Sequence, residues 1–408
     1  METPLQISLA DRLSGIGEYY FSMKLREIDS LNKQGKNIIN LGIGSPDLPP
    51  HPSVIEVLQA ESSKLNTHAY QNYKGSPILR SAISNWYQKW YNVTVNPETE
   101  VLPLIGSKEG IMHICMTYFQ TGDVVLIPNP GYPTYSAAVK LSGATPLHHT
   151  LTEENEWQPS ITDIEKMVVD AQATNNKIKG IFLNYPHMPT GQLPNVETLE
   201  KLIALAQKHG FLIIHDNPYS FILNNNPMSM LSIKGAKDVV LELNSLSKSQ
   251  NMAGWRVGML VAHEERINEV LRFKSNMDSG MFLPVQLAAA QALSLDKDWY
   301  DGVNAIYTER RKKVFELLDV LNCAYSTNQV GMFVWAKAAV TYTTLAEKHV
   351  LGIGGFLSDE VLYNCNVFIT PGGIFGTAGY NYIRVSLCGS IEKFEDAINR
   401  IKTNLKAS

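Results

Sequence analysis

Four short hydrophobic runs, each ending in a turn rich in polar residues, proline or glycine, constrain the fold of this chain most strongly. Such runs are typical of buried strands. They are DVVLIPNPGYP (123–133), IKGIFLNYPHMPTG (178–191), FLIIHDNPYS (211–220) and DVVLELNSLSKS (238–249). Strands of this kind predict a parallel sheet if helices connect them, and the ends of parallel strands meet along one rim, where side chains can converge on a ligand.

The connection between the second and third runs has the pattern of such a helix. Its sequence, VETLEKLIALAQKHG, places apolar residues at helical spacing: Leu199, Leu202, Ile203 and Ala206. Asn195 precedes it as a plausible N-cap, and Gly210 follows as a plausible C-terminal stop. The central part of the chain is therefore expected to be an α/β domain with helices on the faces of a mostly parallel sheet.

The pattern changes near residue 275. A run of small residues, LPVQLAAAQALS, precedes a long charged helical stretch around YTERRKKVFELLDVL, and shorter strand-like pieces follow, GMFVWAK and YIRVSLC. We predict a large domain over residues 45–290 and a smaller α/β domain over 291–408. The N-terminal segment 1–44 is expected to pack with the smaller domain.

Composition excludes several classes of protein. The 408 residues are 44% hydrophobic, enough for a large core, and the net charge of −4 is spread along the chain, which argues against nucleic-acid or anionic-membrane binding. The four cysteines are far apart, without a CxxC pair or zinc-site spacing, which favours free thiols and no metal site. The N-terminus lacks the pattern of a signal peptide, and no apolar segment approaches membrane-spanning length. We expect a soluble, cytoplasmic protein.

One lysine stands out in the turn after the fourth run. The stretch NSLSKSQNMAGWRVG (244–258) holds Lys248 between serines, with Arg256 eight residues further on. A neutral lysine amine forms a Schiff base with an aldehyde, and the cofactor pyridoxal 5′-phosphate (PLP) carries one. A lone Lys–Ser pair is more often a solvated loop, so this interpretation depends on further residues.

A PLP site needs an acid for the pyridine nitrogen, donors for the phosphate and a group that stacks on the ring. Asp216, at the end of an apolar run, fits the first need, although it could also be a turn or N-cap residue. The segment GSKEG (106–110) precedes a helical stretch, whose free N–H groups together with Ser107 suit an anion. Ser245, Ser247 and Arg256 could donate to the same phosphate. Tyr132 could stack on the ring, or it could be a core aromatic.

Together these motifs resemble the class I/II aminotransferases, PLP-dependent enzymes of fold type I. The resemblance runs from GIGSPD (42–47) to YIRVSLC (382–388), and SLSKSQNMAGWRVG is its most specific motif. It implies a large domain with a mostly parallel central sheet flanked by helices, plus a smaller α/β domain. It also implies that Lys248 carries the PLP aldimine and that Arg256 binds the phosphate.

The resemblance also implies roles for the other candidate residues. Asp216 would pair with the pyridine nitrogen, Tyr219 would donate to the ring's O3′, and Tyr132 would stack on the ring. The remaining implied phosphate contacts come from Ser107, Lys108, Ser245 and Ser247. Tyr70 matches a tyrosine that reaches the phosphate of the other subunit, which implies a homodimer with shared active sites. Gly44 and Arg384 match positions that receive the substrate carboxylate; the alternating strand YIRVSL favours a buried arginine over a surface charge.

One position departs from the family. The family usually has an asparagine that donates to O3′ just before Pro-Thr-Gly, whereas NYPHMPTG has Met188 there. A thioether cannot donate a hydrogen bond. Asn184, His187 or Asn217 could substitute, and the sequence does not distinguish among them.

The leading hypothesis is therefore an aminotransferase that moves an amino group from an α-amino acid to a 2-oxo acid, with Lys248 as general acid/base. A lyase of the same fold, such as a C–S β-lyase, is the alternative. A PLP-sensing transcription regulator would need an N-terminal DNA-binding segment, and a dinucleotide-binding fold would need GxGxxG after a strand; neither pattern is present.

The substrate expectation comes from the region after the lysine motif. In dicarboxylate-specific members, this region of the other subunit supplies an arginine for the distal carboxylate. Here it reads SNMDSGMFLPVQLAAAQ (275–291), without arginine or lysine and with Met277, Met281 and Phe282. Neutral or aromatic donors should therefore outperform aspartate, unless Lys24 or Arg26 reaches the pocket.

Overall fold

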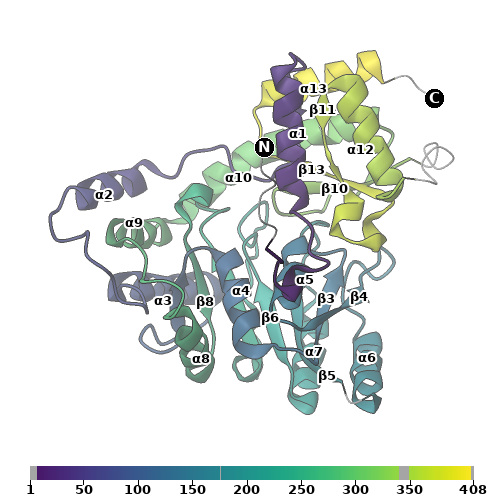
Figure 1. The fold of residues 1–408 in the computed structure, drawn as a ribbon. Helices are drawn as coiled ribbons and strands as arrows, with labels where there is room; N and C mark the ends of the chain where they lie inside the picture. Colours follow the sequence, from purple (N-terminus) through teal and green to yellow (C-terminus); the bar gives the residue numbers. More distant parts are fainter. Residues whose placement is uncertain (1–6, 175, 340–348, 406–408) are drawn as a thin grey trace.

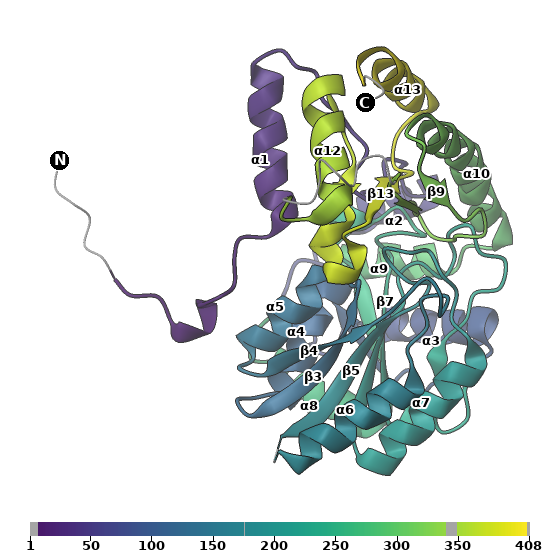
Figure 2. The same ribbon diagram turned by 90° about the vertical axis from the view of Figure 1, so that its right-hand side faces the viewer.

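The computed structural model describes residues 7–174, 176–339 and 349–405. Its largest unit is a seven-stranded sheet with strand order β2-β8-β7-β6-β5-β3-β4 and helices on both faces (Figures 1 and 2). The strands are β2 (Val101–Leu104), β3 (Asp123–Asn129), β4 (Thr145–Thr150), β5 (Lys177–Asn184), β6 (Leu212–Asp216), β7 (Val240–Ser245) and β8 (Gly258–Val261).

The predicted parallel sheet is confirmed. All four hydrophobic runs form strands, β3, β5, β6 and β7, and each pairs with its sheet neighbour in parallel. β4 extends the parallel part beyond β3, while β8 runs antiparallel between β7 and β2. The sheet is therefore mostly parallel, as the sequence predicts for fold type I.

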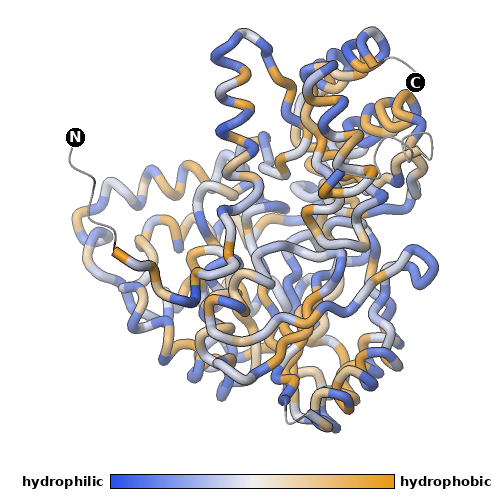
Figure 3. The backbone as a smooth tube through the Cα atoms, turned by 45° about the vertical axis from the view of Figure 1, so that its right-hand side comes forward, coloured by the Kyte–Doolittle hydropathy of each residue, from blue (hydrophilic) through white to orange (hydrophobic). Residues whose placement is uncertain are grey.

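Alternate side chains of each strand face opposite helical layers. In β3, Val125 and Ile127 pack toward the layer of α4 and α5, whereas Leu126 packs toward α6 and α7. The central strands β3, β5, β6 and β7 are accordingly mostly hydrophobic, while hydrophobic and hydrophilic residues alternate along the helices (Figure 3). The helices of this unit are α2 (Pro52–Ser62), α3 (Pro77–Tyr91), α4 (Ser107–Tyr118), α5 (Pro133–Leu141), α6 (Ile161–Ala173), α7 (Val196–His209), α8 (Glu264–Lys274) and α9 (Leu283–Leu293).

The predicted helix between the second and third runs is α7, and both of its predicted ends are confirmed. The Asn195 side chain accepts a hydrogen bond from the Thr198 N–H at 2.9 Å. Gly210 ends the helix with φ of 71°, in the left-handed region that glycine tolerates. The four apolar residues at helical spacing, Leu199, Leu202, Ile203 and Ala206, are buried.

A second unit carries the C-terminal elements. Its four-stranded sheet has the order β12-β13-β10-β9, with antiparallel pairs. The strands are β9 (Ala324–Tyr325), β10 (Phe333–Lys337), β12 (Thr370–Pro371) and β13 (Tyr382–Ser386), and the helices are α10 (Lys297–Val320), α12 (Gly352–Cys365) and α13 (Ile391–Asn404). The described residues also include short 3₁₀ turns: η1 (Asp11–Leu13), η2 (Met230–Ser232), η3 (Ala236–Asp238), η4 (Ala253–Trp255), η6 (Gly372–Phe375) and η7 (Thr377–Gly379).

The N-terminal segment lies against these C-terminal elements. β1 (Ile39–Asn40) pairs in parallel with β11 (Val367–Phe368), and α1 (Tyr20–Lys33) lies beside α12 in both ribbon views (Figures 1 and 2). Ile28 of α1 packs against Leu362 and Phe368. The domain boundaries at residues 44 and 290 stay predictions.

Two further sequence predictions concern membrane-spanning segments and the cysteine thiols. Among the helices that the structure describes, none is long and apolar enough to cross a membrane. The four cysteines are all free; Cys115, Cys323 and Cys365 are buried and Cys388 is half-buried.

Candidate active site

A cavity of about 640 Å³ lies at the rim where the parallel strands end, between the large sheet and the C-terminal elements. It brings together almost all of the residues predicted from the sequence: Gly44, Ser107, Lys108, Tyr132, Asp216, Tyr219, Ser245, Ser247, Lys248, Arg256 and Arg384. Tyr70 does not line it and is 91% exposed. A larger hollow of about 850 Å³, lined among others by Pro49, His51 and Trp299, includes none of the candidate residues.

Lys248 lies in the turn that follows β7. Its Nζ donates to the carbonyl of Gly44 at 2.7 Å and lies 5.8 Å from the centroid of the Tyr219 ring. Burial lowers the pKa of the Lys248 ammonium to about 8. The amine is therefore uncharged in a larger fraction of molecules near neutral pH than an exposed lysine, as a nucleophile requires.

Asp216 is the last residue of β6 and is buried. One carboxylate oxygen, Oδ2, accepts a hydrogen bond from the Tyr135 hydroxyl at 2.8 Å. The other, Oδ1, is buried without a hydrogen-bond partner among the described residues. Burial raises the pKa of Asp216 to about 6, opposed by the Tyr135 hydrogen bond and the charges of His215 and Lys248. A buried acceptor without a partner is costly, so Oδ1 is suited to a cationic N–H donor from a ligand.

The start of α4 borders the same cavity and is suited to an anion. Ser107 and Lys108 are its first residues, and no side chain caps it. The first N–H groups of a helix have no partner within the helix. Gly106 leads into α4 with φ of 88°, and a Cβ at this position would lie 2.1 Å from Nη2 of Arg256. Only glycine allows the guanidinium to approach the helix start this closely.

Ser245, Ser247 and Arg256 line the same cavity. The Ser245 hydroxyl donates to Ser247 Oγ at 2.9 Å, and Arg256 Nη1 lies 3.4 Å from the same oxygen. Arg256 also donates to the carbonyl of Ala253 at 2.9 Å. With the start of α4, these donors suit a phosphate group.

Arg384, in β13, is buried as predicted. Its Nη2 donates to the Gly42 carbonyl at 2.8 Å, Nη1 lies 3.2 Å from the Met188 sulfur, and Nε is buried without a partner in the part of the chain that the structure describes. Its guanidinium carbon lies 3.8 Å from the ring centroid of Phe333 and 4.7 Å from that of Phe375. Burial lowers the pKa of Arg384 to about 10. A carboxylate would satisfy this desolvated cation.

Met188 lines the cavity, at the position where the resemblance implies asparagine. Of the three proposed substitutes, Asn184 also lines it. Its amide already donates to the Asp216 carbonyl at 2.6 Å and accepts from the Met188 N–H at 2.8 Å. His187 and Asn217 do not line the cavity. Asn184 is therefore the better-placed substitute, with one N–H left to donate.

Aromatic residues close the remaining walls. Tyr132 and Tyr219 line the cavity as predicted, and Tyr132 meets Tyr135 edge-on with ring centroids 5.5 Å apart. Tyr135 was not predicted from the sequence, although it stands three residues after Tyr132 in the same NPGYPTY motif. Several apolar and aromatic residues that line the cavity from distant parts of the chain were not predicted either: Tyr19, Phe21, Leu25, Phe333 and Phe375.

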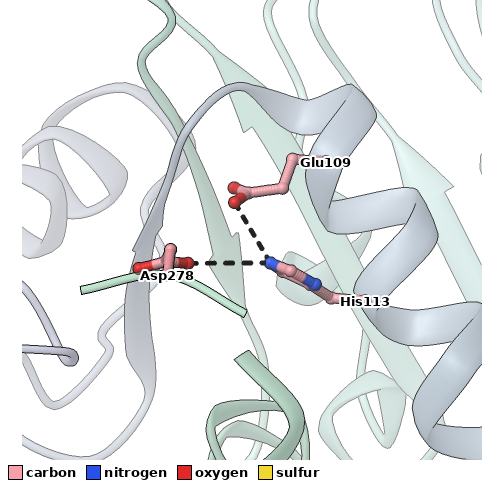
Figure 4. A group of neighbouring side chains, drawn as sticks. All are labelled: Glu109, His113 and Asp278. Carbon is pink, nitrogen blue, oxygen red and sulfur yellow. Dashed lines mark ion pairs between the residues drawn. The ribbon is translucent and has the colours of Figure 1, made fainter. Parts of the chain in front are cut away.

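A second group of titratable side chains lies behind the start of α4. Figure 4 shows His113 between Glu109 and Asp278, and the ligand atoms of the three lie within 4.8 Å of one another. The Lys274 ammonium lies 2.7 Å from Asp278 Oδ1, and the Ile105 N–H donates to Glu109 at 2.6 Å. Because the buried ammonium already balances one carboxylate, we interpret the group as a contact that joins the segment after α8 to α4, and assign no metal to it.

Known proteins resemble this chain over nearly its whole length. The model of the family "Aminotransferase class I and II" matches residues 36–401. LL-diaminopimelate aminotransferases from Dehalococcoides mccartyi and Aquifex aeolicus are 35% and 36% identical, and the alignments cover 98% and 97% of this chain and 100% and 99% of those proteins. The substrate-bound structure of BacF from Bacillus subtilis, 33% identical, has a TM-score of 0.88 over 98% of both chains.

Proposed function

The chain belongs to the class I and II aminotransferases, which are PLP-dependent, and from this premise we propose that it moves the amino group of a neutral or aromatic α-amino acid to a 2-oxo acid. The observation that carries this proposal is one cavity that joins a buried lysine of lowered pKa, a buried aspartate with a free oxygen and a buried arginine. We also retain the cytoplasmic location predicted from the sequence.

The residues of the cavity fit PLP. Asp216 Oδ1 lacks a donor, which a protonated pyridine nitrogen would supply. The start of α4 with Ser107, Lys108, Ser245, Ser247 and Arg256 would hold the phosphate, Lys248 would hold the aldehyde carbon, and Tyr132 and Tyr219 would contact the ring and O3′. When bound, PLP supplies an electron sink for the pair left at the substrate α-carbon.

The chain's own groups would then perform three tasks. Arg384, with the Gly44 backbone, orients the amino acid by its α-carboxylate, which replaces water around the guanidinium. Lys248 Nζ, once the substrate amine has displaced it from the cofactor, would take the proton from the α-carbon, and its lowered pKa suits a base that works near neutral pH. Asp216 stays ionised and pairs with the protonated ring nitrogen. The lyase alternative uses the same groups, but the curated relatives are aminotransferases and favour amino transfer.

The walls of the cavity indicate which side chain the amino-acid donor carries. Around Arg384 the cavity is lined by apolar and aromatic groups from Phe21, Leu25, Ile43, Phe333 and Phe375, which favour an apolar or aromatic side chain. Met277 and Phe282 are 63% and 42% exposed outside this cavity, where a second subunit could use them. LL-diaminopimelate is the second candidate donor, because the relatives that match the full chain carry that name.

We expect leucine, methionine and phenylalanine to give a higher kcat/KM than aspartate or glutamate with one common 2-oxo acid. An unpaired distal carboxylate against the apolar wall would lose several kcal/mol of hydration, roughly 100-fold or more in kcat/KM. LL-diaminopimelate is included in the series. A preference for aspartate or glutamate would contradict the inferred preference of the cavity for neutral or aromatic side chains. A clear preference for LL-diaminopimelate would select the second candidate donor.

We further propose a homodimer with shared active sites. Apolar residues gather on the segment 65–78 and on the segment after α8, and Leu65, Tyr70, Ile78 and Met277 are largely exposed. The two segments touch, with the rings of His68 and Phe282 5.6 Å apart. Exposed apolar surface of this kind is typical of an interface, and Tyr70 would reach the partner's phosphate site from it.

Tyr70→Phe is expected to weaken PLP binding while the enzyme stays dimeric. Removing one hydroxyl bonded to a charged phosphate should raise the Kd of PLP by about 10-fold. Sedimentation gives the oligomeric state and fluorescence titration of the apoenzyme gives the Kd, with Tyr73→Phe on the same segment as the control. A monomeric wild-type protein, or an unchanged Kd in Tyr70→Phe, would contradict the shared site.

A further inference from the structure

A buried histidine and glutamate lie directly behind the candidate active site. His215 of β6 and Glu242 of β7 are partners in the sheet register, and their side chains are 2% and 0% exposed. His215 Nδ1 lies 2.8 Å from Glu242 Oε2, and His215 Nε2 lies 3.1 Å from the carbonyl oxygen of Tyr185. Neither residue lines the cavity, and neither was singled out from the sequence.

The hydrogen bonds define the charge of this pair. A backbone carbonyl can only accept, so His215 Nε2 must carry a proton. Glu242 receives the Met230 N–H at 2.8 Å and the Ser229 and Tyr87 hydroxyls at 2.7 and 3.0 Å, as expected for an ionised carboxylate. With Glu242 ionised, the 2.8 Å contact between His215 Nδ1 and Oε2 requires a proton on Nδ1 as well, because two bare acceptors would repel each other. The arrangement describes an imidazolium–carboxylate pair, the form in which buried charges are tolerated.

This pair adjoins Asp216. His215 precedes Asp216 on β6, so the two side chains leave the strand on opposite faces. Asp216 is otherwise approached by the Tyr135 hydroxyl from α5 and by Lys248 from the turn after β7, while Tyr87 and Tyr91 of α3 lie near Glu242. Burial raises the pKa of Asp216, and the positive charge of His215 lowers it. In the charged form that the hydrogen bonds indicate, His215 favours the ionised form of Asp216.

We propose that His215 and Glu242 are a positioning pair: Glu242 keeps His215 cationic, and His215 keeps Asp216 ionised under the pyridine nitrogen of the cofactor. This inference rests on the proposed function, since it assigns the pair a role through Asp216. Neither residue touches the reacting atoms. The positive charge of His215 acts on Asp216 through space, and the hydrogen bonds to Glu242 stabilise the buried ion pair.

The test uses Glu242→Gln, which keeps the shape and removes the negative charge. Histidine labelled with ¹⁵N reports the protons on His215, and holoenzyme loaded with ¹⁵N-labelled PLP reports the proton on the pyridine nitrogen. At neutral pH we expect both ring nitrogens of His215 to be protonated in the wild type and one in Glu242→Gln. The pyridine nitrogen should lose its proton about one pH unit lower in the variant. Without the positive charge of His215, Asp216 is less readily ionised and holds the protonated pyridine nitrogen less strongly, and a nearby opposite charge typically shifts a pKa by about one unit or more.

The matched control is Tyr87→Phe, which removes a hydrogen bond to Glu242 and leaves both charges in place. Tyr87→Phe should lower the unfolding temperature without changing the pH at which the pyridine nitrogen titrates.

A double variant covers the case in which Glu242→Gln does not fold. His215→Gln combined with Glu242→Gln leaves no unpaired charge in the core and should show the same shift of the pyridine titration. A singly protonated His215 in the wild type, or an unshifted pyridine nitrogen in the charge-removing variant, would overturn the inference. Failure of the protein to bind PLP at Lys248 would instead refute the proposed function and leave the charge of His215 to be measured in the apoprotein.

Discussion

Replacing Lys248 with alanine is expected to lower the rate of amino transfer by at least about 10⁴-fold, since positioned acid–base groups contribute up to this factor and the attachment point of the cofactor is lost as well. The variant should still retain PLP, because the start of α4 with Ser107, Ser245, Ser247 and Arg256 does not depend on the lysine amine. Single-turnover kinetics with an excess of amino acid measure the loss directly.

Borohydride reduction followed by peptide mapping locates the attachment. In the wild type, reduction should fix PLP on the peptide that carries Lys248, and in Lys248→Ala no peptide should be labelled. Lys108→Gln is the control, because Lys108 lines the same cavity with its Nζ 4.5 Å from the centroid of the Tyr19 ring. It should leave labelling of Lys248 intact. Labelling of Lys108 or of another lysine would refute the assignment.

Arg384→Lys is expected to lower kcat/KM for amino acids by about 30- to 5,000-fold. Loss of a buried hydrogen-bonded charge pair typically costs about 2–5 kcal/mol. A lysine keeps the charge but cannot present the planar pair of donors that fits a carboxylate. Most of the loss should appear in KM, because the arginine binds the α-carboxylate throughout the reaction.

Two comparisons test this assignment. Met188→Leu removes the sulfur that lies 3.2 Å from Arg384 Nη1 and keeps an apolar side chain of similar size; it should change KM far less than Arg384→Lys. The wild type should also bind the amino acid much more tightly than the amine that lacks its carboxylate, and Arg384→Lys should narrow this difference. An unchanged KM in Arg384→Lys would show that the carboxylate lies elsewhere.

The sequence by itself determined the central sheet, the caps of α7 and most of the cavity's residues. Each of these depends on local chemistry. Runs such as DVVLEL must be buried, Asn195 and Gly210 satisfy the ends of a helix, and parallel strands bring their C-terminal turns to one rim. Asp216 and Lys248 therefore had to lie near each other once β6 and β7 were parallel neighbours.

Only the tertiary structure decided which groups surround these residues. The Tyr135 hydroxyl on Asp216, the Phe21, Phe333 and Phe375 rings around Arg384 and the pairing of His215 with Glu242 join residues far apart in the sequence. Periodicity indicates which residues are buried but not which buried side chains meet, because that depends on strand register and on how one layer packs on another. The shifted pKa values of Asp216 and Lys248 follow from their burial and their neighbours in the fold, so they could be assigned only after the chain was seen folded.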